Sequence, residues 1–268
     1  MENTNCSIQS LQRAFNILEF LSNSPYGAAL TEISVASGLS KSTTHRFLTS
    51  LADLGYVVKN SSEKYQLTLR MFEIGGRAVR ALDIVEAARP ILDRMAEATK
   101  ETVHLVVRDG NQVVYIYKRH LSAIPINMSS LVGNCSPIYC TGVGKAIFAY
   151  LPEAERREIW NSCNIQRFTP NTITDFQAME EELQRVRDRG YAIDNEEHEL
   201  GIYCIAIPIF DHACNPKYAI SITFPHVRLS DELRDRSLKL LYSASLELSR
   251  LCGLSTSSYH MRIPRASF

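Results

Sequence analysis

The fold is decided by residues 30–56, LTEISVASGLSKSTTHRFLTSLADLGY. Two short amphipathic segments meet at Gly38, and a glycine readily adopts the left-handed conformation that ends a helix. Ser40 follows two residues later and is a good N-cap, because its hydroxyl can accept a hydrogen bond from a first-turn amide. Thr31 is expected to cap the first segment in the same way. This spacing predicts a helix-turn-helix.

The second segment has two unlike faces on a helical wheel of about 100° per residue. Its apolar side, which can face a core, consists of Phe47, Leu48, Leu51 and Leu54, with Thr44 close to them. The opposite side is rich in hydrogen-bond donors, which a solvated helix does not need but which base edges and phosphates accept. We therefore expect this segment to read DNA through Ser40, Lys41, Ser42, Thr43, His45, Arg46 and Thr49.

A β-hairpin is expected directly after this helix. Gly55 ends the helix, and two short runs at residues 56–58 and 65–67 enclose the polar sequence KNSSEK. This order of elements is that of a winged helix-turn-helix, in which Lys59 and Lys64 would flank the wing tip and meet the phosphate backbone. The alternative is an ordinary helical pair with a solvated face, since short helix-turn-helix patterns are common, and the added hairpin disfavours it.

Length and composition fit two domains of a globular protein. The chain has 268 residues, of which 45% are hydrophobic, and its formal charge is zero. Its first 70 residues carry six Lys or Arg against five Asp or Glu, which argues against indiscriminate binding to nucleic acid. Seven scattered cysteines, without a signal peptide or an apolar run of about 18 residues, indicate a reducing cytoplasm and no membrane span.

The chain after the hairpin predicts a helical segment and then a mixed α/β (α+β) domain. The helical segment is expected to form two linked helices, because Pro90 disfavours helix at Arg89, and its apolar stripe suggests a dimer contact. We place the boundaries as follows: winged helix-turn-helix at 8–68, linker and dimerisation segment at 69–100, second domain at 101–253, and a loose tail at 254–268.

Alternating apolar residues dominate the second domain. The alternation on both sides of residues 109–111, Asp-Gly-Asn, predicts a hairpin. Gly190 ends a helix and leads directly into a strand, which suits a central antiparallel sheet flanked by helices. Further strands are expected at 124–128, 191–193, 204–210 and 219–224, and helices at 142–151, 153–162, 175–189 and 230–251.

One segment of this domain suits a carboxylate ligand. In SPIYCTGVGK, residues 136–145, Thr141 starts a helix and is followed by Gly142 and Gly144, so bare backbone amides face whatever lies before the helix. The segment lacks the spacing and the Ser/Thr of a phosphate loop, so a nucleotide is not expected.

Two further segments concentrate polar groups. DNEEHELG, residues 194–201, precedes Cys204, and the alternative to a ligand site here is a solvated acidic loop before a buried structural cysteine. Ser221 and Thr223 share one face of an apolar strand, where their hydroxyls can bond a polar ligand or neighbouring carbonyls.

Four stretches together resemble the IclR-type bacterial transcription regulators. They are LTEISVASGLSKSTTHRFLTSLADLGYV at 30–57, EKYQLTLRMFEIG at 63–75, PIYCTGVGKAIFA at 137–149 and DNEEHELGIYCIAIPIFD at 194–211. Within that family, TKETVHL, VVYIYK, YAIDNEEHELG and ISITFPHVR look most like regulators of ketodeoxygluconate and related sugar-acid catabolism.

The resemblance implies a DNA-binding regulator with a dimerising helical linker and a GAF-like effector domain, which forms a homodimer or homotetramer on DNA and binds a small organic acid. We expect a repressor whose dimer places two copies of the Lys41 to Thr49 helix in successive major grooves of a palindromic operator. No cofactor or metal is expected. Thr223 stands where serine is common in the family, and Val143 where alanine is common. The effector-binding residues expected on this basis are Gly142, Val143, Asp194, Cys204, Ser221 and Thr223, and Ser136 is added from the small and polar segment 136–145.

Two other functions are alternatives. A transcriptional activator would share every residue named above. An enzyme would use Cys204 as nucleophile with His104, His198 or His212 as base, or a metal in the acidic segment. No nucleophile signature surrounds the cysteine and an apolar strand raises a thiol pKa, so an enzyme is disfavoured.

Overall fold

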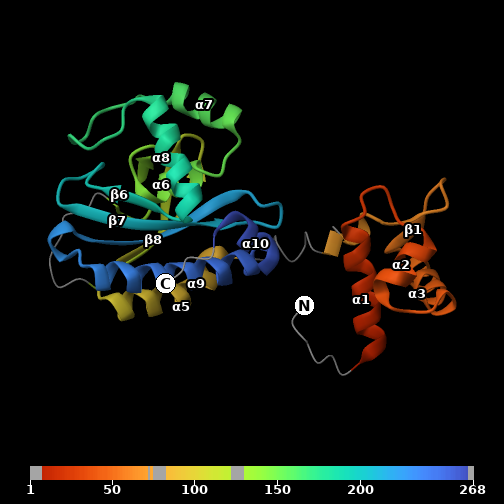
Figure 1. The fold of residues 1–268 in the computed structure, drawn as a ribbon. Coiled ribbons are helices and arrows are strands. Elements are labelled where there is room, and N and C mark those ends of the chain that lie inside the picture. The colour runs from red at the N-terminus through yellow and green to blue at the C-terminus, as the bar shows by residue number, and fades with distance from the viewer. Residues whose placement is uncertain (1–7, 72, 75–82, 122–129, 265–268) are drawn as a thin grey trace. The chain divides into compact units, whose positions relative to one another are not determined.

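The computed structural model describes residues 8–71, 73–74, 83–121 and 130–264, and the chain divides into two compact units, Met1–Ala81 and Leu82–Phe268 (Figure 1). The strand expected at 124–128 and much of the apolar stripe of the linker lie outside the described residues. None of the described helices is long and apolar enough to span a bilayer.

The first unit is a winged helix-turn-helix, as the sequence predicted. It contains α1 (Gln9–Ser22), α2 (Leu30–Ser37), α3 (Lys41–Asp53) and an antiparallel hairpin of β1 (Val57–Lys59) and β2 (Tyr65–Leu67). One buried side of each helix faces a common core, because apolar side chains recur there at helical spacing. The buried members of this core include Ile17, Leu18, Leu21, Ile33, Leu48, Leu51 and Val57.

The turn between α2 and α3 has the expected geometry. Gly38 adopts φ 64°, and the Ser40 hydroxyl accepts from the Thr43 amide at 3.2 Å. The expected cap at Thr31 is wrong, because α2 begins one residue earlier and the Glu32 carboxylate accepts from the Ala29 amide at 2.6 Å. A carboxylate at this position both satisfies a free amide and faces the positive helix end.

Leu54 is also placed differently from the prediction. It lies just after the end of α3, where the backbone turns, and its side chain is 59% exposed rather than buried. The helical wheel fails there because the helix has already ended.

The second unit is built on a six-stranded antiparallel sheet in the order β5-β4-β3-β8-β7-β6. The hairpin predicted at residues 109–111 is confirmed, since β3 and β4 pair directly across it. The other predicted strands in the described range are found within a few residues of their expected limits. The strands are β3 (Thr102–Asp109), β4 (Gln112–Arg119), β5 (Cys135–Pro137), β6 (Ala192–Asn195), β7 (Ile202–Phe210) and β8 (Pro216–Pro225).

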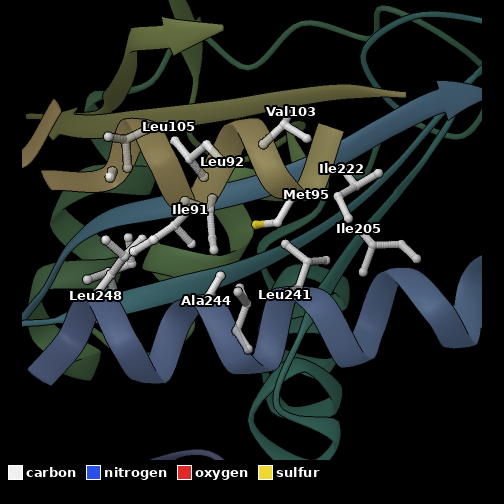
Figure 2. Close-up of a cluster of buried hydrophobic side chains, with 14 of the residues drawn as sticks. Ile91, Leu92, Met95, Val103, Leu105, Ile205, Ile222, Leu241, Ala244 and Leu248 are labelled. Atoms are coloured by element: carbon white, nitrogen blue, oxygen red, sulfur yellow. The ribbon is translucent and has the colours of Figure 1, made fainter. Parts of the chain in front are cut away.

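Helices cover both faces of this sheet (Figure 1). One face packs against α5 (Ile84–Thr99) and α9 (Asp231–Leu251), while α6 (Gly142–Phe148) and α8 (Phe176–Arg189) lie on the other side. α7 (Glu153–Ser162), the short 3-10 helix His226–Arg228 and α10 (Thr256–Arg262) complete the unit. Figure 2 shows the core under α5 and α9, formed by Ile91, Leu92, Met95, Val103, Leu105, Ile205, Ile222, Leu241, Ala244 and Leu248.

α5 is a single helix that continues through Pro90, so the expected break at Arg89 is wrong. Pro90 is exposed, and the Glu86 carbonyl that loses its donor also belongs to an exposed residue. On the other side of the helix Ile91 and Leu92 are buried in the core, and this burial outweighs one missing backbone hydrogen bond.

The expected loose tail is likewise corrected, because residues 256–262 form α10 and two side chains, one in the helix and one directly after it, are buried. Tyr259 and Ile263 are fully buried, and the Tyr259 hydroxyl donates to Ser245 Oγ at 2.9 Å. Ser245 in turn donates to the Pro208 carbonyl at 2.6 Å. The C-terminal segment is therefore anchored to α9 and β7.

Replacing this anchor tests its contribution. We expect Tyr259→Ala to lower the unfolding free energy by about 3–5 kcal/mol, as is typical of a buried aromatic residue, and Tyr259→Phe by about 1 kcal/mol for the lost hydrogen bond. Urea unfolding measures both, with Met261→Ala as control because Met261 is 79% exposed on the same helix. Equal stability of Tyr259→Ala and Met261→Ala would contradict the anchor.

Candidate functional site

The strand register brings the predicted polar residues of the second unit into adjacent rows. Asp194 on β6 pairs with Cys204 on β7, which pairs with Thr223 on β8. In the next row on the same face, Ser221 on β8 pairs with His104 on β3. Residues two apart on a strand point to the same side, so these groups share the sheet face that α6 covers.

α6 begins with two glycines, and Gly142 lets the helix approach this face closely, because a Cβ there would lie 3.1 Å from Cys204 Sγ. A Cβ on Gly144 would instead lie 2.2 Å from the carbonyl oxygen of Ile138, in the turn before the helix. Thr141 caps the helix as predicted, its Oγ1 accepting from the Gly144 amide at 3.1 Å. The amides of Gly142 and Val143 belong to the first turn, which has no carbonyl four residues earlier in the helix.

A small pocket of about 40 Å³ lies between the start of α6 and the sheet. It brings together six of the seven residues predicted to bind an effector: Gly142, Val143, Asp194, Cys204, Ser221 and Thr223. Ser136 does not line it and is instead buried beside the Tyr115 hydroxyl. The other lining residues are His104, Tyr115, Ser130, Thr141, His198, Glu199 and Ile202.

Asp194 is the acidic group of the pocket. Burial, and to a lesser extent the nearby Glu197 carboxylate, raise the pKa of Asp194 to about 7. The carboxyl group therefore stays protonated up to nearly neutral pH. Its Oδ1 accepts from the Glu197 amide at 2.7 Å. Behind it, the buried Lys145 ammonium forms an ion pair with Glu197 and lies 3.9 Å from Glu182 Oε1.

Two neighbouring groups of the pocket, His104 and Cys204, are uncharged. Burial lowers the pKa of His104 to about 3, with Lys118 and His120 acting in the same direction, so the imidazole is neutral. Burial raises the pKa of Cys204 to about 12, which is the opposite of what a nucleophilic thiol needs. The pocket can therefore bind a polar ligand by hydrogen bonds but is poorly suited to cysteine chemistry.

The side chains of the acidic segment 194–201 are divided between two places. Asp194, His198 and Glu199 line the pocket, while Glu197 is buried against Lys145. Within the described ranges, no cluster of three or more His, Cys, Asp or Glu side chains is arranged to hold a metal ion.

In the first unit, α3 presents the predicted polar face to solvent. Lys41, Ser42, His45, Arg46 and Thr49 are all exposed, whereas Thr44, Leu48 and Leu51 are buried. Ser40 and Thr43 have structural partners, since the Ser40 hydroxyl caps the helix and lies 2.9 Å from Thr43 Oγ1. The exposed side chains are free of the core and can reach a groove or a phosphate.

The wing is less cationic than predicted. Lys59 forms an ion pair with Glu63 within the turn, and Lys64 is only half exposed. Glu63 lies in the turn of the wing and adopts φ 60°. A phosphate would have to compete with Glu63 for Lys59.

Two family models match the chain. One, described as "Bacterial transcriptional regulator IclR C-terminal", covers residues 76–250, and the other, "IclR helix-turn-helix domain", covers residues 10–61. The chain belongs to the IclR family. It is a DNA-binding transcriptional regulator of that family and not an enzyme.

Individual relatives extend over nearly the whole IclR-family chain. The HTH-type transcriptional regulator KdgR of Escherichia coli (strain K12) is 37% identical over 248 residues, 92% of this chain and 94% of that protein. The DNA-binding transcriptional repressor YiaJ of the same organism is 35% identical over 250 residues, 92% and 89% of the two chains. The crystal structure of the Thermotoga maritima IclR is 33% identical with a TM-score of 0.62, over 91% of this chain and 99% of that one.

His104, Tyr115 and Ser130 line the pocket of this IclR-family regulator but were not predicted to bind an effector. From the sequence, His104 is expected only as the base of the enzymatic alternative. Its place beside Ser221 follows from the pairing of β3 with β8, which are more than a hundred residues apart in sequence. The alternation of apolar and polar residues shows which side chains share one face of a strand, but it does not show which other strand lies beside it.

The raised pKa of Asp194 gives a test by stability. A carboxyl protonated more readily in the folded state stabilises it at low pH, and this contribution is lost as pH rises from about 4 to about 7. We expect the wild-type unfolding free energy to fall across that range by up to about 1.4 kcal/mol per pH unit from this group. In urea unfolding, Asp194→Asn should reduce the dependence of the unfolding free energy on pH between about 4 and about 7. The same pH dependence in the variant and the wild type would contradict a raised pKa of Asp194.

Proposed function

We propose that this protein is a repressor whose operator binding is modulated by a small organic acid, a sugar acid or a ketoacid, held in the pocket under α6. The observation that carries the proposal is the convergence of Gly142, Asp194, Cys204, Ser221 and Thr223 on one pocket, in a chain with a donor-rich α3. The relative YiaJ is named a repressor, which supports repression over activation.

The pocket suits one carboxylate and a short polar tail. The Ser221 and Thr223 hydroxyls can donate to a carboxylate, and the amides at the start of α6 lie on the opposite wall. Asp194 would donate to the ligand while protonated and repel a ligand carboxylate once ionised. We therefore infer an acid as ligand and Asp194 as the residue that makes its binding depend on pH.

For DNA we propose that a dimer places two copies of α3 in successive major grooves of a palindromic operator. The contacts would come from the exposed face of α3, and the wing would support them through phosphates. The residues proposed to take part are Ser40, Lys41, Ser42, Thr43, His45, Arg46, Thr49, Lys59 and Lys64.

We further propose that residues 8–68 bind DNA, 69–100 link and dimerise, and 101–253 bind the effector in a homodimer or homotetramer. Within the linking segment, α5 packs on the sheet of the second unit. A ligand that changes the sheet could thus act on the helix that leads toward the DNA-binding unit. Coupling requires different effector affinities in the DNA-bound and free states, and a factor of ten corresponds to about 1.4 kcal/mol.

The DNA-binding helix is tested at Arg46. Arg46→Ala should weaken operator binding by about 1–3 kcal/mol, with relaxed specificity if the side chain reads a base and a uniform loss if it holds a phosphate. Gel-shift titration on the protein's own upstream region measures this. The control is Arg157→Ala, which also removes one positive charge, from an exposed side chain on α7 of the other unit. Unchanged affinity for Arg46→Ala would remove this face of α3 from the interface.

The effector pocket is tested at Asp194. Calorimetric titration with pyruvate, glyoxylate and D-gluconate should show acid binding that weakens as pH rises through about 7, because Asp194 then loses its proton. Asp194→Ala should bind the same acid more weakly at pH 6, show little pH dependence, and still bind the operator. Wild-type affinity at pH 6 in this variant would take Asp194 out of the site.

A further inference from the structure

Three buried charged side chains meet behind the pocket, where α6, α8 and the segment after β6 come together. Lys145 on α6 is 1% exposed, and its ammonium forms an ion pair with the Glu197 carboxylate. Glu182 on α8 lies 3.9 Å from the same ammonium and also binds Arg189 at 2.7 Å. Glu197 Oε2 is buried and accepts no hydrogen bond from the described residues, so Lys145 compensates this carboxylate through one oxygen only.

The backbone of Glu197 is fixed on both sides. Its amide donates to Asp194 Oδ1 at 2.7 Å, and its carbonyl accepts from the Thr172 hydroxyl at 2.6 Å. The buried Thr169 hydroxyl donates to the preceding carbonyl, that of Glu196, at 2.6 Å. These bonds hold the Glu197 carboxylate in the neighbourhood of the Asp194 carboxyl group.

Glu197 and Lys145 act on Asp194 in opposite directions. After burial, the Glu197 charge is the main cause that raises the pKa of Asp194, while Lys145 and the amide hydrogen bond lower it. Burial also raises the pKa of Glu197, and the Lys145 ammonium opposes that rise. The ion pair therefore favours a charged Glu197, and that charge disfavours a second carboxylate beside it.

Most other titratable groups around Asp194 are neutral near pH 7. Burial lowers the pKa of the two histidines and raises the pKa of the two cysteines and the tyrosine. These groups are His104, His198, Cys140, Cys204 and Tyr115. Glu199 is the second carboxyl group of the described pocket lining. Of the two glutamates, Glu197 is the one whose amide bonds Asp194 directly.

We propose that Glu197, held by Lys145, keeps the Asp194 proton in place up to nearly neutral pH, so that the regulator binds its effector carboxylate together with that proton. The proton would lie between the two carboxyl groups, one from Asp194 and one from the ligand. This inference rests on the proposed function, because it presumes an acid in the pocket. It makes the regulator respond to the concentration of the acid and to pH together.

Glu197 and Lys145 are positioning residues in this proposal, because neither lines the pocket. A merely structural role would change acid binding by the same factor at every pH. A role in holding the proton would change it only at the pH where Asp194 of the variant is ionised and Asp194 of the wild type is not. The dependence of affinity on pH therefore separates the two roles.

The experiment follows acid binding by full-length protein over pH. Glyoxylate, pyruvate, lactate and D-gluconate are titrated calorimetrically, and the tightest of them is followed from pH 5 to pH 8.5. The variants are Glu197→Gln, which leaves Lys145 with Glu182, and the double variant Glu197→Gln with Lys145→Met, which removes both charges at once. Glu181→Gln on the exposed face of α8 is the matched control, and Glu199→Gln tests the other carboxyl group.

Glu197→Gln should bind the acid as the wild type does at pH 5 and about tenfold more weakly at pH 8, because Asp194 then ionises at lower pH. The added Lys145→Met should recover part of the loss at pH 8, since Lys145 favours the ionised form of Asp194. Glu181→Gln should behave as wild type. Equal losses at pH 5 and pH 8, or no loss at pH 8, would overturn the proposal. A larger change of pH dependence in Glu199→Gln than in Glu197→Gln would overturn it as well.

A measurement without ligand separates this inference from the proposed function. Asp194→Asn is compared with its parent chain by urea unfolding between pH 4 and pH 8, once with Glu197 present and once with Glu197→Gln. The part of the pH dependence that Asp194→Asn removes should be smaller in the chain with Glu197→Gln. Equal parts would overturn the role of Glu197. A wild type that binds none of the acids but gives the expected unfolding result would instead contradict the proposed function.

Discussion

The close approach of α6 to the sheet is the constraint on which the second unit depends. It depends on Gly142, where a Cβ would lie 3.1 Å from Cys204 Sγ and 3.5 Å from the Ala206 Cβ on β7. Gly144 serves the turn before the helix, because a Cβ there would meet the Ile138 backbone, which cannot move aside as a flexible side chain can. The space left at the start of the helix becomes the pocket, so one packing requirement determines both the fold and the place of the site.

Much of the fold can be predicted from local sequence patterns. Gly38 and Ser40 define the turn of the first unit, and alternation around residues 109–111 defines the first hairpin of the second. The failures occur where tertiary packing outweighs a local preference. α5 passes through Pro90 because its other side is buried, and α10 forms because Tyr259 finds a buried place beside Ser245.

The candidate site shows the same division. Segments rich in small and polar residues drew attention to Gly142, Asp194 and Cys204, and the pocket contains all three. His104 and Ser130 could not be predicted as pocket residues, because their place depends on which strands are neighbours. The pairing of β3 with β8 joins segments far apart in the sequence. Ser136 was expected there because it shares the segment of Gly142, but it lies within β5, where its buried hydroxyl bonds the Tyr115 hydroxyl.

The buried ion pairs around Lys145 limit how this domain can vary. Lys145 is 1% exposed and joins Glu197, beside the pocket, to Glu182 on α8, which also holds Arg189. Exchange of any one member leaves a charge stranded in a medium that solvates it poorly. These residues can therefore be replaced together, for example by apolar residues of similar volume, whereas replacing them one at a time would destabilise the fold. Homologues with altered ligand preference would have to keep this set intact or change it as a unit.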